Sequence, residues 1–340
     1  MNRVQRTPSA GQASVRLGQQ GTEDTKGSES VQALRQLSRL PWLRRGAQLL
    51  LTIVPLAYVV GTLVSNWQVL SQYDWHPNAA RMLGALCLFV LARTPLPFSS
   101  DRAFSALGYA LPLRTVLRGY HISALSGYLP GGLFIGRPVF FGEHGVDVIS
   151  ASAGIVMEQS MLTAAGLLCS LPYLFLAGAG AVPNLWVLGV VVVPLTLIVF
   201  YPDFINRMVR WMLARAGYQD RGVNLTSRQL VTMFLLDIVH WLLAGTASYF
   251  LVTSVYAAPS RLFPILASAH NLAAVLAIVI ALTPGGFGIA EGATTLLLTP
   301  FLPAPLPALM AVLTRIWLVT ARVVLFALGS LLGSPALPKR

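Results

Sequence analysis

Long apolar runs separated by short polar segments make up most of the sequence after its first 45 residues. Apolar runs of roughly 17 to 25 residues are long enough to cross the hydrocarbon layer of a bilayer. The pattern predicts six full membrane spans, at about residues 47–66, 80–96, 148–176, 184–200, 229–256 and 307–332. We therefore expect an all-α polytopic membrane protein.

Two further apolar stretches are interrupted by glycine and proline. The first contains Pro130-Gly131-Gly132 before Arg137, and the second contains Pro284-Gly285-Gly286-Phe287-Gly288 before Glu291. In both, the charged residue stands seven positions after the proline. Broken backbone within a membrane is tolerated only where protein or a water-filled cavity surrounds the freed groups. We predict two re-entrant, broken-helix hairpins arranged as an inverted repeat. Two alternatives stay open: chance similarity of the breaks, and a full span over 262–283.

Basic residues lie mostly in the tails and in the loops between the apolar runs, including a stretch that starts at Arg93. By the positive-inside rule, both termini are expected in the cytoplasm. The resulting organisation is a mostly disordered basic tail at 1–45, a first transmembrane repeat at 46–203, a cytoplasmic basic loop at 204–228, a second transmembrane repeat at 229–333 and a cytoplasmic tail at 334–340.

Composition supports the membrane assignment, because 55% hydrophobic and 11% charged residues are unlike an ordinary soluble domain. The net charge of +12 is explained by membrane orientation and by contact with anionic head groups, so we expect no nucleic-acid partner. Cys87 and Cys169 both lie in apolar runs, and no metal-ligand cluster, phosphate-binding loop or nucleophile elbow is present. We expect neither a metal nor a cofactor.

Six ionisable residues fall inside the apolar segments, where each costs roughly 2.5 to 3.5 kcal/mol. They are Arg137, Glu158, Asp237, Glu291, Arg315 and Arg322. Because three are acidic and three basic, we expect ion pairs across a helix bundle, and such pairs could serve only to fix helix packing. Arg137 and Glu291 stand beside broken backbone, which favours ligand binding instead.

Two polar residues close to these charges are further candidates. His240 follows Asp237 by three positions, on the same helical face. The two could form a proton relay, or His240 could simply be buried and hydrogen-bonded. Asn271 lies shortly before the second break and is a candidate for lining a cavity.

The segment from Pro284 to Glu291 resembles the P-G-G-x-G-x-x-E signature of the lysylphosphatidylglycerol synthase transmembrane-region family, the flippase-like part of bacterial lipid-aminoacylating proteins. The first break resembles that family's first-half pattern, and Arg315 falls where the family tends to carry an arginine in its last span. The resemblance covers about residues 45–332. Family members often carry a basic residue where this chain has Ala290. We find no soluble aminoacyl-transferase domain in the sequence, so we expect that this chain does not synthesise the lipid.

The resemblance implies a protein of the bacterial inner membrane that moves an anionic or aminoacylated phospholipid, or another lipid-linked molecule, between leaflets. Arg137 and the freed N–H groups near Gly131, Gly132, Gly285, Gly286 and Gly288 would hold a phosphate. Glu291 and Glu158 would balance Arg137, Arg315 and Arg322, or bind a cationic head group. A partner transferase and a homo-oligomer both stay open.

Two other functions remain as alternatives. An intramembrane enzyme acting on a lipid-linked substrate would need a nucleophile or metal site, for which His144 with Glu143 is the nearest candidate. An accessory subunit of a lipid or glycan synthase would move no lipid by itself.

Overall fold

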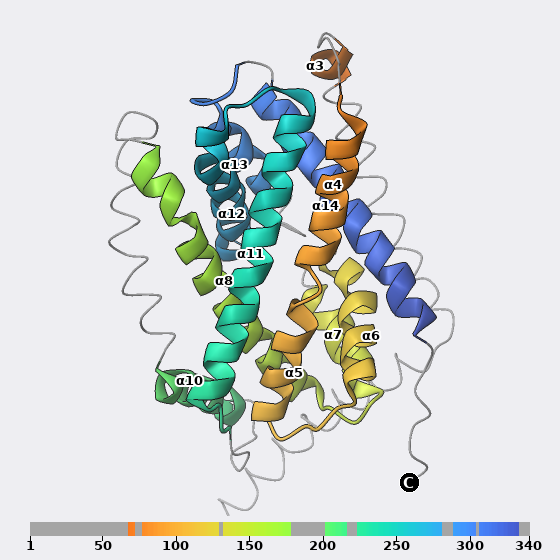
Figure 1. The fold of residues 1–340 in the computed structure, drawn as a ribbon. Helices are drawn as coiled ribbons and strands as arrows, with labels where there is room; N and C mark the ends of the chain where they lie inside the picture. Colours follow the sequence, from red (N-terminus) through yellow and green to blue (C-terminus); the bar gives the residue numbers. More distant parts are fainter. Residues whose placement is uncertain are drawn as a thin grey trace, which may run out of the picture. The chain divides into compact units, whose positions relative to one another are not determined.

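The computed structural model describes residues 67–71, 77–128, 132–177, 201–215, 223–280, 288–303 and 306–332 (Figure 1). All of them belong to one unit of the chain, Val54–Arg340. Within these ranges every regular element is a helix, and none is a strand. The predicted all-α fold is therefore confirmed for the described residues.

The helices in chain order are α3 Trp67–Ser71, α4 Ala79–Ala92, α5 Leu96–Ala106, α6 Leu113–Ser123, η1 Ala124–Tyr128, α7 Leu133–Gly142, α8 Val148–Leu176, α10 Pro202–Arg215, α11 Ser227–Val255, η2 Ser260–Leu262, α12 Phe263–Ile280, α13 Ile289–Leu298 and α14 Leu306–Leu331.

Five segments are long and apolar enough to cross a membrane: Ala79–Ala106, Val148–Leu176, Ser227–Val255, Ser260–Val279 and Leu306–Leu331. Four of these correspond to predicted spans. The fifth, which includes α12, matches the alternative left open for 262–283. Predicted spans 47–66 and 184–200 lie outside the described residues. The chain is a multi-pass integral membrane protein.

Side-chain caps fix where the two longest helices begin. The Asp147 carboxylate accepts the Ser150 N–H at 2.8 Å at the start of α8. Thr226 and Gln229 form a reciprocal capping box at the start of α11. Such caps satisfy N–H groups that have no partner within the helix. Each helix has 29 residues, so at about 1.5 Å per residue it exceeds the hydrocarbon thickness.

The first described span is broken, which the sequence pattern did not predict. α4 ends at Ala92, Arg93 forms its C-cap, and α5 begins after Pro95 (Figure 1). Proline lacks an N–H and its ring clashes with the carbonyl four residues earlier, so it interrupts the helix. We expected the span to end near residue 96, with Arg93 opening a cytoplasmic loop. Instead, Arg93 lies within the candidate span Ala79–Ala106.

The two glycine-containing breaks each separate a pair of helices. η1 precedes the first break and α7 follows it, while α12 precedes the second and α13 follows it. α7 and α13 are apolar but have only 10 residues each, too few to cross the membrane alone.

A further difference concerns the predicted basic loop at 204–228, whose first part belongs to the amphipathic helix α10.

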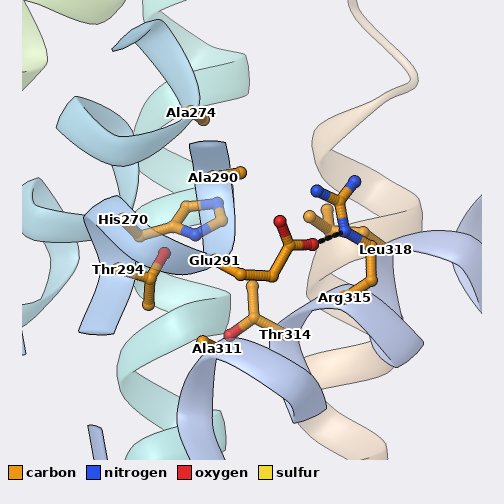
Figure 2. Close-up of a pocket in the computed structure, with 9 residues that line it drawn as sticks. All are labelled: His270, Ala274, Ala290, Glu291, Thr294, Ala311, Thr314, Arg315 and Leu318. Carbon is orange, nitrogen blue, oxygen red and sulfur yellow. Dashed lines mark hydrogen bonds and ion pairs between the residues drawn. The ribbon is translucent and has the colours of Figure 1, made fainter. Parts of the chain in front are cut away.

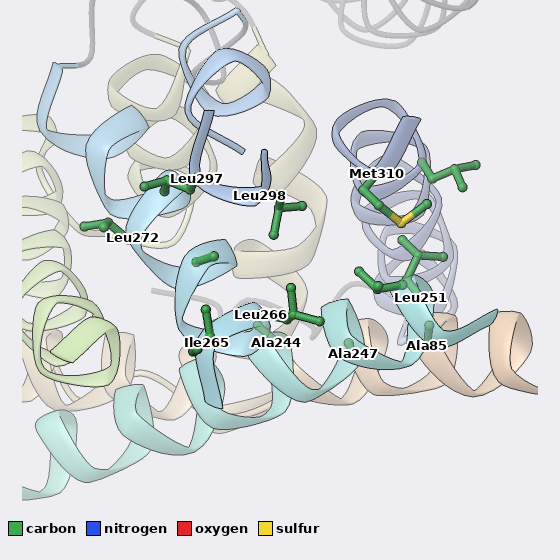
Figure 3. Close-up of a cluster of buried hydrophobic side chains, with 14 of the residues drawn as sticks. Ala85, Ala244, Ala247, Leu251, Ile265, Leu266, Leu272, Leu297, Leu298 and Met310 are labelled. Carbon is green, nitrogen blue, oxygen red and sulfur yellow. The ribbon is translucent and has the colours of Figure 1, made fainter. Parts of the chain in front are cut away.

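Helix α11 organises the packing, because it contacts α4, α5, α8, α12 and α14. Figure 3 shows a buried apolar cluster in which residues of α11 lie with residues of α4, α12, α13 and α14. The labelled residues are Ala85 of α4, Ala244, Ala247 and Leu251 of α11, Ile265, Leu266 and Leu272 of α12, Leu297 and Leu298 of α13, and Met310 of α14. A Cβ atom on Gly245 would lie 2.9 Å from the Ala267 carbonyl oxygen. Small residues thus let α11 and α12 approach closely, as is common between membrane helices.

Two buried hydrogen bonds tie α8 to its neighbours. The Trp241 indole N–H donates to the Leu162 carbonyl at 2.8 Å, and the Tyr173 hydroxyl donates to the Leu297 carbonyl at 2.9 Å. These bonds connect α8 with α11 and with α13, the helix that follows the second break. Helix α13 is therefore anchored to the main bundle.

Candidate functional site

Glu291 of α13 forms two interactions directly after the second break. Gly288, the N-cap of α13, has φ +79°, a conformation that favours glycine. One Glu291 oxygen accepts the Gly288 N–H at 2.7 Å, and the other accepts the Nε–H of Arg315 on α14. The carboxylate therefore caps the short helix and forms an ion pair with the next long helix.

A small cavity borders this ion pair (Figure 2). Its volume is about 30 Å³, and its polar lining comes from His270, Glu291, Thr294, Thr314 and Arg315. Figure 2 shows the Glu291 carboxylate directed at Arg315, with His270 and Thr294 on its other side. A space of this size suits about one water molecule. It is much too small for a lipid head group in the present conformation.

Arg137 of α7 forms the corresponding pair at the first break. Its Nη1 donates to Glu158 of α8 at 2.7 Å, and the two side chains are 3% and 0% exposed. The guanidinium also lies over the Tyr120 ring, 4.3 Å from the centroid. A Cβ atom on Gly136 would collide with Ser126, so α7 is in close contact with η1. The first pair is thus enclosed by protein on all the sides described.

Asp237 on α11 is a further carboxylate of the bundle, and no arginine in the described part of the chain pairs with it. Its side chain is fully buried, and neither oxygen forms a hydrogen bond of normal geometry among the described residues. Ser99 and Glu158 are its polar neighbours. Asp237 therefore adds a second acidic group next to the Arg137–Glu158 pair.

The predicted relay between Asp237 and His240 is not formed. His240 Nδ1 lies 2.7 Å from the Ala92 carbonyl oxygen, so its N–H donates there. The alternative of a buried, hydrogen-bonded histidine is the arrangement observed. Asn271 of α12 is also buried, with its Nδ2 3.5 Å from the Cys169 carbonyl and its Oδ1 without a partner among the described residues.

The predicted glycines are only partly described. Gly132 is buried and forms the N-cap of α7 with an ordinary helical φ of −60°. Gly131, Gly285 and Gly286 lie outside the described residues. Their expected part in holding a phosphate stays a prediction.

Arg93 is a polar residue of the bundle that sequence reasoning missed. It interacts electrostatically with Arg315 and Arg322 of α14 and with Tyr120 and Tyr128. Its positive charge also interacts electrostatically with three histidines: His121 of α6, His240 of α11 and His270 of α12. The signal that could have identified it is Pro95, which breaks the span just after Arg93.

His121 does not add to this positive charge. It lies in α6, outside the five candidate spans. Burial, together with the nearby Arg93 and Arg137 guanidiniums, lowers the pKa of His121 to about 4. Its imidazole is therefore neutral at pH 7, and the positive charge in this region comes from arginines.

The residues considered for metal binding or enzyme chemistry are arranged differently. In the described part of the chain, no group of three or more His, Cys, Asp or Glu side chains is placed to hold a metal ion. His144 is engaged locally, with its Nδ1 2.9 Å from the Phe140 carbonyl and its ring stacked on Phe140. Glu143 beside it is exposed.

Comparison with known proteins leaves the family resemblance as a prediction, because no protein-family model and no curated protein matches the chain.

Proposed function

We propose that the protein is flippase-like, similar to the transmembrane region of lysylphosphatidylglycerol synthases, and moves a phospholipid or lipid-linked molecule between leaflets of the bacterial inner membrane. The observation that supports this most is the pair of ion pairs beside broken helices, Arg137–Glu158 and Glu291–Arg315. An apolar contact of similar volume is often as stable as a buried ion pair. Charges kept at both breaks therefore favour a role beyond packing.

In this proposal the full architecture has six spans and two re-entrant hairpins, one containing α6, η1 and α7 and the other α12 and α13. The hairpins are inverted copies, and alternating access is a rocking of one repeat against the other. Because Arg137 is enclosed by Glu158 and Tyr120, we assign first contact with the head group to Glu291 and Arg315. Separation of Glu291 from Arg315 would free the guanidinium to bind a phosphate and the carboxylate to bind an amine.

The test is leaflet exchange of fluorescent phospholipids in liposomes that contain the purified protein. Wild-type protein should accelerate exchange, and Glu291→Gln should abolish it while the protein still inserts and folds. The matched control is Glu143→Gln, which neutralises an exposed carboxylate outside the bundle and should leave exchange unchanged.

Each other outcome contradicts part of the proposal. Exchange that survives Glu291→Gln would remove Glu291 from the mechanism. If well-folded wild-type protein moves no lipid, the accessory-subunit function gains support, above all if the protein co-purifies with a transferase. Turnover of a lipid-linked substrate that is lost in Glu143→Gln would favour an enzyme instead.

A further inference from the structure

Arg93 and Arg322 have no acidic partner among the residues that the structure describes. The sequence contains 12 acidic residues, of which the structure describes seven, and none of these pairs with Arg93 or Arg322. Glu158 and Glu291 are occupied by other arginines, and the neighbours of Asp237 are Ser99 and Glu158. The bundle therefore carries two positive charges without a counter-charge among the described residues.

Helix α14, which carries Arg322, packs on α4, whose C-cap is Arg93. Arg322 exerts the strongest effect of any charged side chain on Arg93, and Arg315 adds to it. The Nε atoms of both Arg93 and Arg322 are buried and have no hydrogen-bond partner within the described ranges. Unsatisfied guanidinium donors near a second cation are costly away from water.

Aromatic contact offsets only part of this cost. The Arg322 guanidinium lies over the Tyr128 ring, 4.6 Å from the centroid. A cation–π contact of this kind contributes less than the cost of one charge at the bilayer centre. The Tyr128 face also holds the guanidinium in a fixed orientation, which suits recognition of a planar or tetrahedral oxyanion.

Arg93 and Arg322 are half-buried rather than fully buried. Arg322 lies on a helix that also presents apolar side chains outward: Val323, Val324 and Leu328 of α14 are 49%, 37% and 51% exposed, as expected for a helix that faces acyl chains. An anion that approaches from this surface comes from the bilayer, where phosphate groups of lipids are the abundant oxyanions.

We propose that Arg93 and Arg322 bind the phosphate oxygens of a membrane lipid head group, at a site separate from the Arg137–Glu158 and Glu291–Arg315 pairs. The proposal deepens the proposed function by naming an anionic lipid as the ligand class, and it rests on that function only for what happens to the lipid after binding. The break at Pro95 places Arg93 in the site, and the Tyr128 ring places Arg322.

The experiment measures thermal unfolding and ligand affinity of the full chain in neutral detergent. The probes are short-chain phosphatidylglycerol, short-chain phosphatidylcholine and inorganic phosphate, each added separately. Arg93→Gln and Arg322→Gln are compared with Arg228→Gln, which removes one exposed arginine from the start of α11. Arg93→Lys is included because it keeps the charge if the glutamine variant folds poorly.

We expect the order of thermal stability of wild type and Arg93→Gln to differ between the conditions without and with lipid. Without lipid, Arg93→Gln should unfold at the same temperature as wild type or higher, because it removes a repelled charge. With phosphatidylglycerol, wild type should be stabilised more, since loss of either arginine weakens binding about tenfold or more. Arg228→Gln should bind like wild type. A merely structural arginine would instead lower stability under both conditions, which would overturn the proposal.

Binding of inorganic phosphate and of phosphatidylcholine distinguishes between the possible classes of ligand. Inorganic phosphate that binds as tightly as phosphatidylglycerol, with the same dependence on Arg93 and Arg322, would identify a site for free anions and overturn the lipid assignment. Equal binding of phosphatidylcholine would overturn selectivity for a net anionic head group.

Failure of this inference can be told from failure of the proposed function. Phosphatidylglycerol affinity and lipid exchange are measured separately, and the control Glu143→Gln should leave both unchanged. Binding that depends on Arg93 without any lipid exchange would refute transport and leave the site standing. Exchange in a protein whose arginine variants bind lipid like wild type would refute the site alone.

Discussion

Both broken-helix regions contain an ion pair, and the charged residue after the break is basic in the first region and acidic in the second. The two regions differ in how closely protein surrounds the pair. At each break the charged residue seven positions after the proline pairs with the next long helix, α8 in one case and α14 in the other. The Arg137 and Glu158 side chains are 3% and 0% exposed, whereas Glu291 is 15% exposed and borders a cavity of about 30 Å³.

This difference suggests separate roles for two pairs that look equivalent in sequence. An enclosed pair cannot exchange its partner for a ligand unless helices separate, so it holds α7 against α8. A pair beside a cavity can admit water and then a ligand group with a smaller rearrangement. Mutations that remove one charge from each pair should therefore act on different properties.

The largest expected effect comes from Glu158→Gln. It leaves the Arg137 guanidinium buried without a counter-charge, which typically destabilises by about 3 to 5 kcal/mol. The free energy of unfolding in mixed detergent micelles measures this. The double variant Arg137→Met with Glu158→Leu should recover most of the loss, because apolar residues of similar volume often replace a buried ion pair. A loss below about 1 kcal/mol, the range of exposed pairs, would show that the first pair is not enclosed.

Glu291→Gln should cost less stability, about 1 to 3 kcal/mol, although it is the variant expected to stop transport. The carboxamide oxygen can still accept the Gly288 N–H, and the cavity can supply a water to Arg315. The same unfolding measurement gives the comparison. If Glu291→Gln destabilised the protein as much as Glu158→Gln, the contrast between an enclosed and an open pair would be lost.

Sequence periodicity predicted the long helices well because they are continuous apolar runs with polar ends. The predicted spans 148–176, 229–256 and 307–332 correspond to Val148–Leu176, Ser227–Val255 and Leu306–Leu331. Length and composition determine such helices locally.

Sequence reasoning failed at the α4–α5 break for an equally physical reason. An arginine near the end of an apolar run is typical of a span boundary, so the pattern counts Arg93 with the basic residues that mark the cytoplasmic side. Its place inside a candidate span depends on α5 continuing the apolar segment after Pro95. The sequence also could not predict which charged residues form ion pairs. Arg137 and Glu158 are 21 residues apart and meet only through the packing of α7 on α8.

The smallest expected effect is that of Asp237→Asn, and it tests whether the first region is organised by one ion pair or by a network. Asp237 is completely buried beside Glu158, and its oxygens lack a hydrogen bond of normal geometry among the described residues. Asparagine has almost the same shape and removes an acidic group that interacts electrostatically with Glu158. We therefore expect a change in unfolding free energy within about 1 kcal/mol in either direction. A loss as large as that of Glu158→Gln would mean that Asp237 shares the Arg137 charge, and the enclosed region would then be a three-residue network rather than a pair.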